Sequence, residues 1–287
     1  MENAKFFYDT ALKNLNVISR YAGVDWLTIT TSDPTRRTSV LKRFLRLKEA
    51  FLLMGELPKD WGMRGYRGIS IGSARWGTRR DGDILILSGM DALTFWRIFA
   101  PLGENCSRID LAVTVQLEHP QPNLLGLYCD WLRGNGSRTA KRATSMERVD
   151  GIGATLYINK RSSDQMGRVY DKGAEMKDVL MTHRLWRYEL ELKGTRAKKA
   201  LGQLLDAGDA LPSRIVETAW KWFNDRDIPP LFDRYTPDGY LIQMDVSARV
   251  TSSSQQLNWL SSQVKPTVAR LRKAGLEAEV ISALGLD

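Results

Sequence analysis

Residues 107–115 read SRIDLAVTV, and their polar and apolar side chains alternate as in a β-strand with one wet face. Residues two apart in a strand share a face, so Arg108 and Asp110 point to the same side. Two later stretches alternate in the same way, GRVYDK at 167–172 and WRYELELK at 186–193. Three strands that each carry a polar face predict a mostly antiparallel sheet.

The rest of the chain predicts helices and further strands around this sheet. Strands are predicted near 24–31, 67–73, 83–88 and 153–160, and helices at the N-terminus and near 38–55, 90–100 and 123–133. The stretch 134–153 lacks periodicity and predicts an exposed loop. From Thr195 onward the pattern is helical, with a break at 228–239 before a helix pair near 254–285.

Together these elements predict an α+β fold, with a central, mostly antiparallel sheet, helices packed on one face and a helical C-terminal tail. We expect a sheet-based domain over 1–230. We expect a helical segment over 231–287 that binds DNA or a partner.

Charge and cysteine content limit the class of protein. Lys and Arg outnumber Asp and Glu by 42 to 33, for a formal net charge of +9, which favours a polyanionic partner. Cys106 and Cys129 lack CxxC spacing, so neither a disulfide framework nor a zinc ribbon is indicated, and a reducing cytoplasm is expected. No apolar run approaches the roughly 18 residues of a membrane span, so no membrane partner is expected.

The polar strand faces offer the parts of a phosphoryl-transfer site. Asp110, Glu189 and Glu191 could hold a hard divalent cation such as Mg²⁺ or Mn²⁺. Tyr170 lies between Arg168 and Lys172 on one predicted strand. The simpler alternative is a wet sheet face whose acids and bases meet water or pair across strands.

Tyr170 needs help to act as a nucleophile. A phenol has an ordinary pKa of about 10, so forming phenolate at neutral pH costs roughly 4 kcal/mol. Nearby cations or a base must offset this cost, and the cations could also clamp a phosphate. The candidates are Arg168, Lys172, Arg108 and Arg187. Attack by Tyr170 would keep the bond energy in a phosphotyrosine, so that the strand can be rejoined.

Other residues are candidates for contact with DNA. Trp76 lies among Arg75, Arg79 and Arg80, where an aromatic ring and cations suit nucleic acid, or else a solvated hairpin tip. Arg161 and Ser163 follow the strand at 153–160 and could hold a phosphate, or form an ordinary turn. The two histidines, His119 and His183, are far apart and are expected at the surface rather than as metal ligands.

The segments that carry this chemistry resemble one family. RIDLAVTV at 108–115 resembles the Arg-x-Asp strand of the Rep_trans family, the replication initiation factors of certain rolling-circle plasmids and filamentous phages, with related relaxases of integrative elements. ATLYINKRSSDQMGRVYDKGAE at 154–175 resembles its Tyr-Asp-Lys block, and WRYELELKGTRA at 186–197 resembles the strand that follows.

The resemblance implies nicking and joining of single-stranded or extruded origin DNA through a 5′-phosphotyrosyl intermediate. It places the nucleophile at Tyr170 and a Mg²⁺ or Mn²⁺ ion at Asp110 and Glu189, with Glu191 or Glu175 as further ligands. Two positions depart from the family pattern. Thr114 stands where many members have a second acid, and Asn159-Lys160 stands where many have Gly-Ser.

Two other functions remain open at this point. Thr114 suggests a DNA-binding regulator that has lost nicking, and a conjugative relaxase would use the same chemistry for DNA transfer. DNA is the expected partner in every case. A host helicase and a second copy of the chain are partners that the sequence leaves open.

Overall fold

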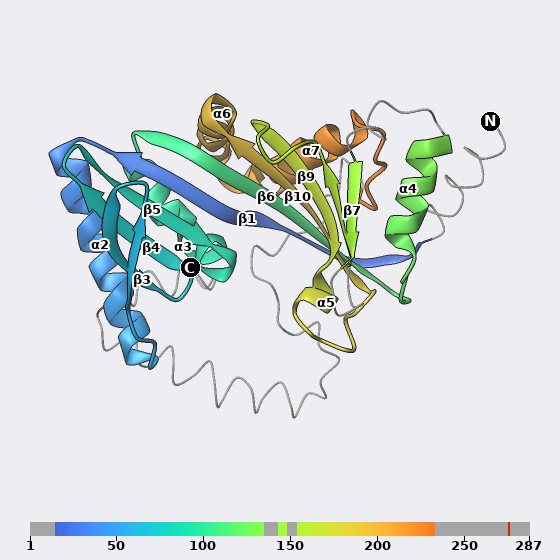
Figure 1. Cartoon of the computed structure of the whole chain (residues 1–287), viewed down its shortest axis with the longest axis horizontal. Coiled ribbons are helices and arrows are strands. Elements are labelled where there is room, and N and C mark those ends of the chain that lie inside the picture. The colour runs from blue at the N-terminus through green and yellow to red at the C-terminus, as the bar shows by residue number, and fades with distance from the viewer. Residues whose placement is uncertain (1–14, 135–142, 148–153, 233–274, 276–287) are drawn as a thin grey trace. The chain divides into compact units, whose positions relative to one another are not determined.

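The computed structural model describes residues 15–134, 143–147, 154–232 and 275, with the backbone alone for 143–147 (Figure 1). The chain groups into two compact units, which we treat separately. Unit 1 comprises residues 1–24 and 108–242, and unit 2 comprises 25–107 and 243–287. These units divide the stretch 1–230 that the sequence predicts as one domain. The predicted N-terminal helix and the helix pair near 254–285 lie outside the described residues, apart from residue 275.

Unit 1 is built on an antiparallel sheet. Its strands lie in the order β1, β6, β10, β9, β8, β7. Their bounds are β1 (Val17–Thr31), β6 (Asn105–Leu117), β10 (Leu185–Lys193), β9 (Gln165–Asp171), β8 (Ala154–Ile158) and β7 (Ala143–Glu147). Both β1 and β6 also have residues in unit 2. The three strands that were predicted to carry polar faces are β6, β10 and β9, and they are therefore neighbours in the sheet.

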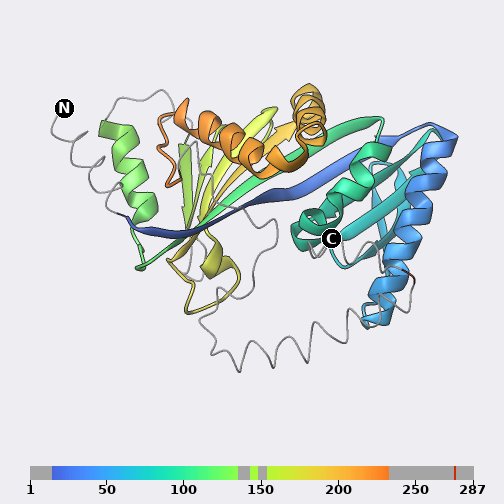
Figure 2. The same cartoon turned by 180° about the vertical axis from the view of Figure 1, so that it is seen from behind.

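Helices cover one face of the unit 1 sheet, as Figure 2 shows for α6 (Gly194–Leu205) and α7 (Leu211–Asn224). Tyr188 of β10 points to this face, where its ring lies 5.5 Å from that of Phe223 in α7. Its hydroxyl lies 2.6 Å from that of Tyr128 in α4 (Leu124–Gly134). Burying such a side chain contributes about 1.5–3 kcal/mol. Gly167 is required here, because a Cβ would lie 2.3 Å from the Trp222 ring.

Unit 2 contains a second antiparallel stretch of sheet, in the order β2, β3, β4, β5, β1. Its further elements are β2 (Lys59–Met63), β3 (Tyr66–Ile71), β4 (Ala74–Arg79), β5 (Gly82–Ser88), α2 (Pro34–Leu53), α3 (Gly89–Phe99) and the short 3-10 helix η1 (Ala100–Leu102). Helix α2 begins at Pro34 after Asp33, whose side chain accepts a hydrogen bond from the Arg36 backbone at 2.8 Å. Phe44 of α2 packs on Trp76 of β4, with ring centroids 6.2 Å apart.

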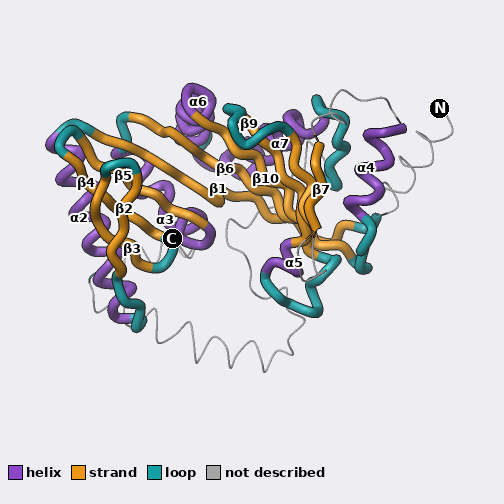
Figure 3. Tube along the Cα trace, in the orientation of Figure 1, coloured by secondary structure: helices purple, strands orange, loops and turns teal. Residues whose placement is uncertain are grey.

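The α+β class and the mostly antiparallel sheet are confirmed, and Figure 3 shows how strands and helices alternate along the chain. Strands β2, β4 and β7 were not predicted. Strand β4 occupies the arginine-rich segment around Trp76, and β7 falls within the predicted loop 134–153. Within the part of the chain that the structure describes, no helix has the length and apolar character needed to span a membrane.

Candidate active site

Tyr170 lies near the end of β9, on the sheet face opposite to helix α7. In an antiparallel sheet, residues directly opposite each other share a face. Tyr170 is opposite Arg187 of β10 and Thr155 of β8. Its hydroxyl donates a hydrogen bond to Glu189 Oε2 at 3.1 Å. The predicted nucleophile and a predicted acid are thus in direct contact.

A cation links this acid to the next. Arg168 Nη2 contacts Asp110 Oδ2 at 3.1 Å and forms an ion pair with Glu189. Arg168 is directly opposite Glu189 in the register, so the backbone pairing itself sets this contact. Tyr170, Glu189, Arg168 and Asp110 therefore form one continuous chain of polar contacts across three strands.

The chain of contacts continues along the same face. Arg108 Nη2 binds Asp110 Oδ2 at 2.5 Å and Glu191 Oε2 at 2.8 Å. Lys193 Nζ binds Glu191 Oε1 at 2.6 Å. The three predicted metal-binding acids are thus all paired with cations, as the simpler alternative of cross-strand pairing expects.

Burial makes these pairs electrostatically strong. Asp110 and Glu189 are 1% and 3% exposed. Burial raises the pKa of Asp110, against hydrogen bonding and charge from Arg108. Burial alone would lower the pKa of Arg168, but the negative charges of Glu189 and Asp110 outweigh it and raise this pKa. Arg168 therefore stays charged throughout the neutral range.

The two departures from the family pattern each have a structural role. Thr114, where many members have an acid, lies opposite Arg187 and accepts a hydrogen bond from its Nε at 2.9 Å. Asn159 adopts a left-handed backbone with φ of 72°, which glycine and asparagine tolerate better than other residues. The change from Gly to Asn159 therefore preserves the turn, whereas Thr114 removes a carboxylate from this face.

The turn after Tyr170 is fixed by Asp171. The buried Asp171 carboxylate accepts hydrogen bonds from the backbone nitrogens of Ala174 at 2.9 Å and His183 at 2.7 Å. Its Oδ2 also lies 2.8 Å from His183 Nδ1. A Cβ on Gly173 would lie 2.0 Å from the Met181 carbonyl oxygen, so only glycine fits there. His183, expected at the surface, has a side chain that is 35% exposed, and it also braces the segment beside Tyr170.

Lys172 requires a correction. The sequence places it on the strand face with Arg168 and Tyr170, but β9 ends at Asp171 and Lys172 begins the short helix α5 (Lys172–Glu175). Its Nζ forms an ion pair with Glu175 and lies 6.0 Å from the centroid of the Tyr170 ring. Lys172 thus remains near the nucleophile, although it reaches Tyr170 from a helical turn.

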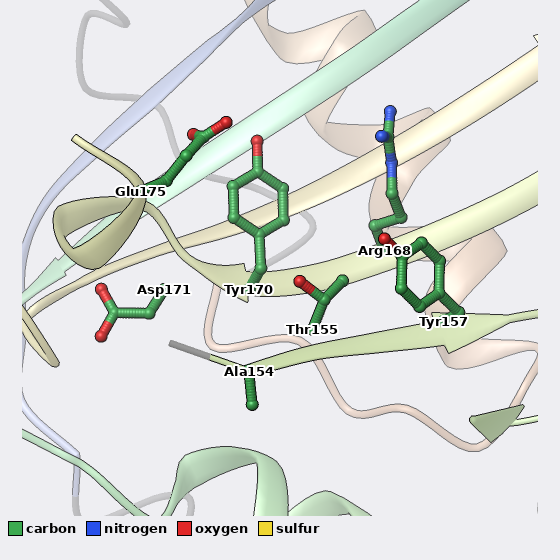
Figure 4. A pocket seen from close by; sticks show the side chains of 7 residues that line it. All are labelled: Ala154, Thr155, Tyr157, Arg168, Tyr170, Asp171 and Glu175. Carbon is green, nitrogen blue, oxygen red and sulfur yellow. The ribbon is translucent and has the colours of Figure 1, made fainter. Parts of the chain in front are cut away.

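A pocket of about 270 Å³ opens beside Tyr170. In Figure 4 the Tyr170 side chain projects from β9, with Thr155 beside it and the Tyr157 ring next to Arg168. The pocket is lined by Ala154, Thr155, Tyr157, Arg168, Tyr170, Asp171 and Glu175. Sequence reasoning did not assign Thr155 and Tyr157 to the site. Their two-residue spacing in ATLYI puts them on one strand face, but the pairing of β8 with β9 could not be read from that spacing.

The described arrangement does not fit a bound divalent ion. Carboxylate oxygens are suitable ligands for Mg²⁺ or Mn²⁺, and those of Asp110 and Glu189 converge on one point. Arg168 Nη2 fills that point. Among the residues that the structure describes, no group of three acidic, histidine or cysteine side chains could hold a metal ion. An ion at Asp110 and Glu189 would require Arg168 to move.

The remaining DNA-binding candidates fall in two places. Arg161 and Ser163 lie in the turn after β8, and their carbonyl oxygens accept hydrogen bonds from Lys193 Nζ at 2.5 and 3.4 Å. Arg75, Trp76 and Arg79 belong to unit 2.

The predicted grouping of Trp76 with Arg75 and Arg79 needs a second correction. Trp76 points to the α2 side of the sheet, whereas the two arginines point to the other face. There, Arg75 lies 5.9 Å from the centroid of the Trp26 ring, and Arg79 lies 4.5 Å from that of Tyr66. Trp76 is half-buried and packs on Phe44, apart from the two arginines, and its contact with DNA stays a prediction.

Comparison with known proteins gives a family match and a similar solved structure. Residues 104–283, more than half of the chain, match the family model described as Rep_trans, replication initiation factor. No curated protein matches significantly. A solved structure described as the rolling circle replication initiator protein from Geobacillus stearothermophilus is similar in fold, with a TM-score of 0.52 and 23% sequence identity. The match covers 85% of this chain and 96% of that one.

Proposed function

Because the chain belongs to the Rep_trans family of replication initiation factors, we propose that it starts rolling-circle replication by nicking one strand of origin DNA with Tyr170. The observation that carries this proposal is the hydrogen bond from the Tyr170 hydroxyl to Glu189 Oε2. Through this contact, the Glu189 carboxylate can act as the base that a phenol needs at neutral pH.

The proposed reaction is a transesterification. Tyr170 Oη forms a bond to the phosphorus as the bond from phosphorus to the 3′-oxygen breaks. The phenol proton passes to Glu189, and the departing 3′-oxygen takes up a proton from solvent. The product is a 5′-phosphotyrosine with a free 3′-hydroxyl, and the reverse reaction rejoins the strand.

The cations beside Tyr170 stabilise charge in this reaction. Arg168 lines the pocket, and Lys172 Nζ lies 6.0 Å from the centroid of the tyrosine ring. Both can attract the phosphate and stabilise the negative charge of its transition state. Arg108 and Arg187 act one step further away by holding Asp110 and Thr114.

A divalent ion is a separate part of the proposal. Mg²⁺ or Mn²⁺ would bind Asp110 and Glu189 with Arg168 displaced, and Glu191 is the next acid along the face. When bound, it would supply charge neutralisation at the phosphate. No step above depends on it.

The nicking proposal is tested by trapping the covalent product. Wild-type protein is incubated with single-stranded origin DNA, with and without Mn²⁺, and adducts are resolved on a denaturing gel. We expect a 5′-phosphotyrosyl adduct that maps to Tyr170 by mass spectrometry. Tyr170→Phe should form none, while Tyr21→Phe, a half-buried tyrosine of β1, should react as wild type does.

Failure of the wild-type adduct, or equal adduct with Tyr170→Phe, would overturn the proposal. DNA binding without any adduct would favour the nicking-inactive regulator instead. A conjugative relaxase would give the same adduct, so the assignment to replication needs a second assay. Replication of an origin plasmid, scored in cells with wild-type or Tyr170→Phe protein, separates these two roles.

A further inference from the structure

Two side chains of β8 line the pocket beside Tyr170 and have no part in the reaction above. Tyr157 is directly opposite Arg168, and Thr155 is directly opposite Tyr170. Both are half-buried, so each offers part of its surface to the pocket. Their side chains share a sheet face with the nucleophile. In Figure 4, Thr155 lies beside Tyr170 and the Tyr157 ring lies beside Arg168.

The pocket combines an aromatic surface with donors suited to a phosphate. The Tyr157 ring has Arg161 5.9 Å from its centroid, and Arg168 lines the same pocket. Arg168 Nε is buried and has no hydrogen-bond partner among the described residues. An unpaired buried donor is unfavourable, and the Arg168 side chain is 22% exposed, so this guanidinium has unused capacity for an acceptor such as a phosphate oxygen.

A nucleotide next to the cleaved bond has matching chemistry. Its base has an apolar face that stacks on aromatic rings, and its phosphate accepts hydrogen bonds from guanidinium and hydroxyl groups. Proteins that bind single strands stack unpaired bases on aromatic side chains in this way. The register places the aromatic ring of Tyr157 and the hydroxyl of Thr155 one strand away from the attacking oxygen.

We propose that the β8 pocket binds one of the two nucleotides that flank the cleaved phosphate, with its base stacked on Tyr157 and its phosphate held by Thr155 and Arg168. This inference rests on the proposed nicking function. It makes Tyr157 a positioning residue, which fixes the single strand so that the phosphorus faces Tyr170.

The test measures binding in a protein that cannot react. In a Tyr170→Phe background, a short all-thymidine oligonucleotide with one 5-iododeoxyuridine is bound and photo-crosslinked, and crosslinked peptides are identified by mass spectrometry. We expect the crosslink in the peptide that contains Tyr157. Changing Tyr157→Leu should weaken binding roughly 5- to 100-fold, in keeping with the loss of one stacked base.

Matched variants separate stacking from general damage. Tyr157→Phe keeps the ring and should bind within about twofold of the parent, since stacking needs no hydroxyl. Tyr21→Leu removes a half-buried tyrosine outside the pocket and should leave the affinity unchanged. Thr155→Val should weaken binding, whereas Thr155→Ser should not. Thermal unfolding of each variant checks that the fold is retained.

Two results would overturn the pocket proposal. One is equal affinity of Tyr157→Leu and Tyr157→Phe, and the other is a crosslink that avoids β8 altogether. Neither depends on nicking, because the Tyr170→Phe background is unreactive by design. Conversely, stacking on Tyr157 with no adduct in the wild-type protein would retain the pocket and reject the nuclease.

Discussion

At the scale of single residues, Arg168 connects most of the site. Its Nη2 contacts Asp110 and Glu189 together, and Glu189 in turn accepts the hydrogen bond from Tyr170. A buried carboxylate without a cation is costly, so the guanidinium stabilises the acids in the absence of metal. The same position is the place where a divalent ion would bind, and the two cations cannot occupy it together.

This competition predicts the effect of Arg168→Gln on metal affinity. Removing the guanidinium leaves Asp110 and Glu189 as unneutralised oxygen ligands, so Mn²⁺ should bind more tightly, by about tenfold or more. Electron paramagnetic resonance of free Mn²⁺ measures this directly. Arg214→Gln, at an exposed arginine of α7 that pairs with Glu217, is the control for net charge. Unchanged or weaker Mn²⁺ binding by a folded Arg168→Gln protein would rule out a metal site at these acids.

The residues of the site differ in how far the sequence reveals them. Two-residue periodicity gave the shared faces of β6, β9 and β10, because each side chain's direction is local to its strand. Which acid meets which cation depends on register, which requires the fold. Tyr157 was missed for that reason. Lys172 was misplaced because Asp171 ends the strand by capping α5 through the Ala174 backbone nitrogen, and a long-range contact with His183 holds its carboxylate in that position.

At the scale of elements, prediction succeeded where a segment is long and strongly patterned, as in β6, β10 and α2. Strand β4 was missed because its sequence, ARWGTR, mixes arginines and a glycine and lacks a simple apolar alternation. On the face of Arg75 and Arg79, the apolar surface over β4 comes from a neighbouring strand, since Gly77 lies beneath the Trp61 ring. Strand β7 is an edge strand with a single partner, β8, and edge strands carry weaker sequence signals.

The start of α3 gives a pH prediction. Asp91 accepts a hydrogen bond from the Ser73 backbone at 2.6 Å, which ties α3 to the β3–β4 turn, and burial raises its pKa to about 6. The folded state therefore holds this proton more tightly than the unfolded chain, whose value is 3.8. The stabilisation that comes from protonated Asp91 is present at low pH. It is lost as the pH rises from about 4, near the pKa of the unfolded chain, to above about 6, the pKa of the folded protein.

Urea unfolding of wild type and Asp91→Asn across this range measures the effect. Relative to the variant, which does not titrate, the free energy of unfolding of the wild type should fall by up to about 3 kcal/mol between about pH 4 and pH 6.5. A difference that stays constant with pH would show that folding does not raise the pKa of Asp91. Unfolding is best followed by signals from unit 2, because two units need not unfold together.

At the scale of the whole molecule, the net charge of +9 favours a polyanionic partner, and unit 2 is a candidate to bind it as well as unit 1. The Rep_trans match begins at residue 104, so most of unit 2 precedes it. One face of the unit 2 sheet carries the aromatic side chains of Trp26 and Tyr66. The charged residues in the strands on this face are Lys59, Arg75 and Arg79. No carboxylate occurs among the described strand residues on that face. Its charge and aromatic rings both suit a single strand of DNA.

This distribution predicts how salt affects DNA binding by each unit. Binding of single-stranded DNA should weaken steeply with salt, and each lost phosphate contact should reduce the slope of log K against log salt by about 0.7. Arg75→Gln and Arg79→Gln should each produce that reduction, with little change in sequence preference, if unit 2 contacts the backbone. Arg214→Gln lowers the net charge equally from an exposed site on α7 and should leave the slope unchanged. Slopes that match wild type for both unit 2 variants would exclude phosphate contacts by Arg75 and Arg79, because a contact that releases no counterions is not a phosphate contact.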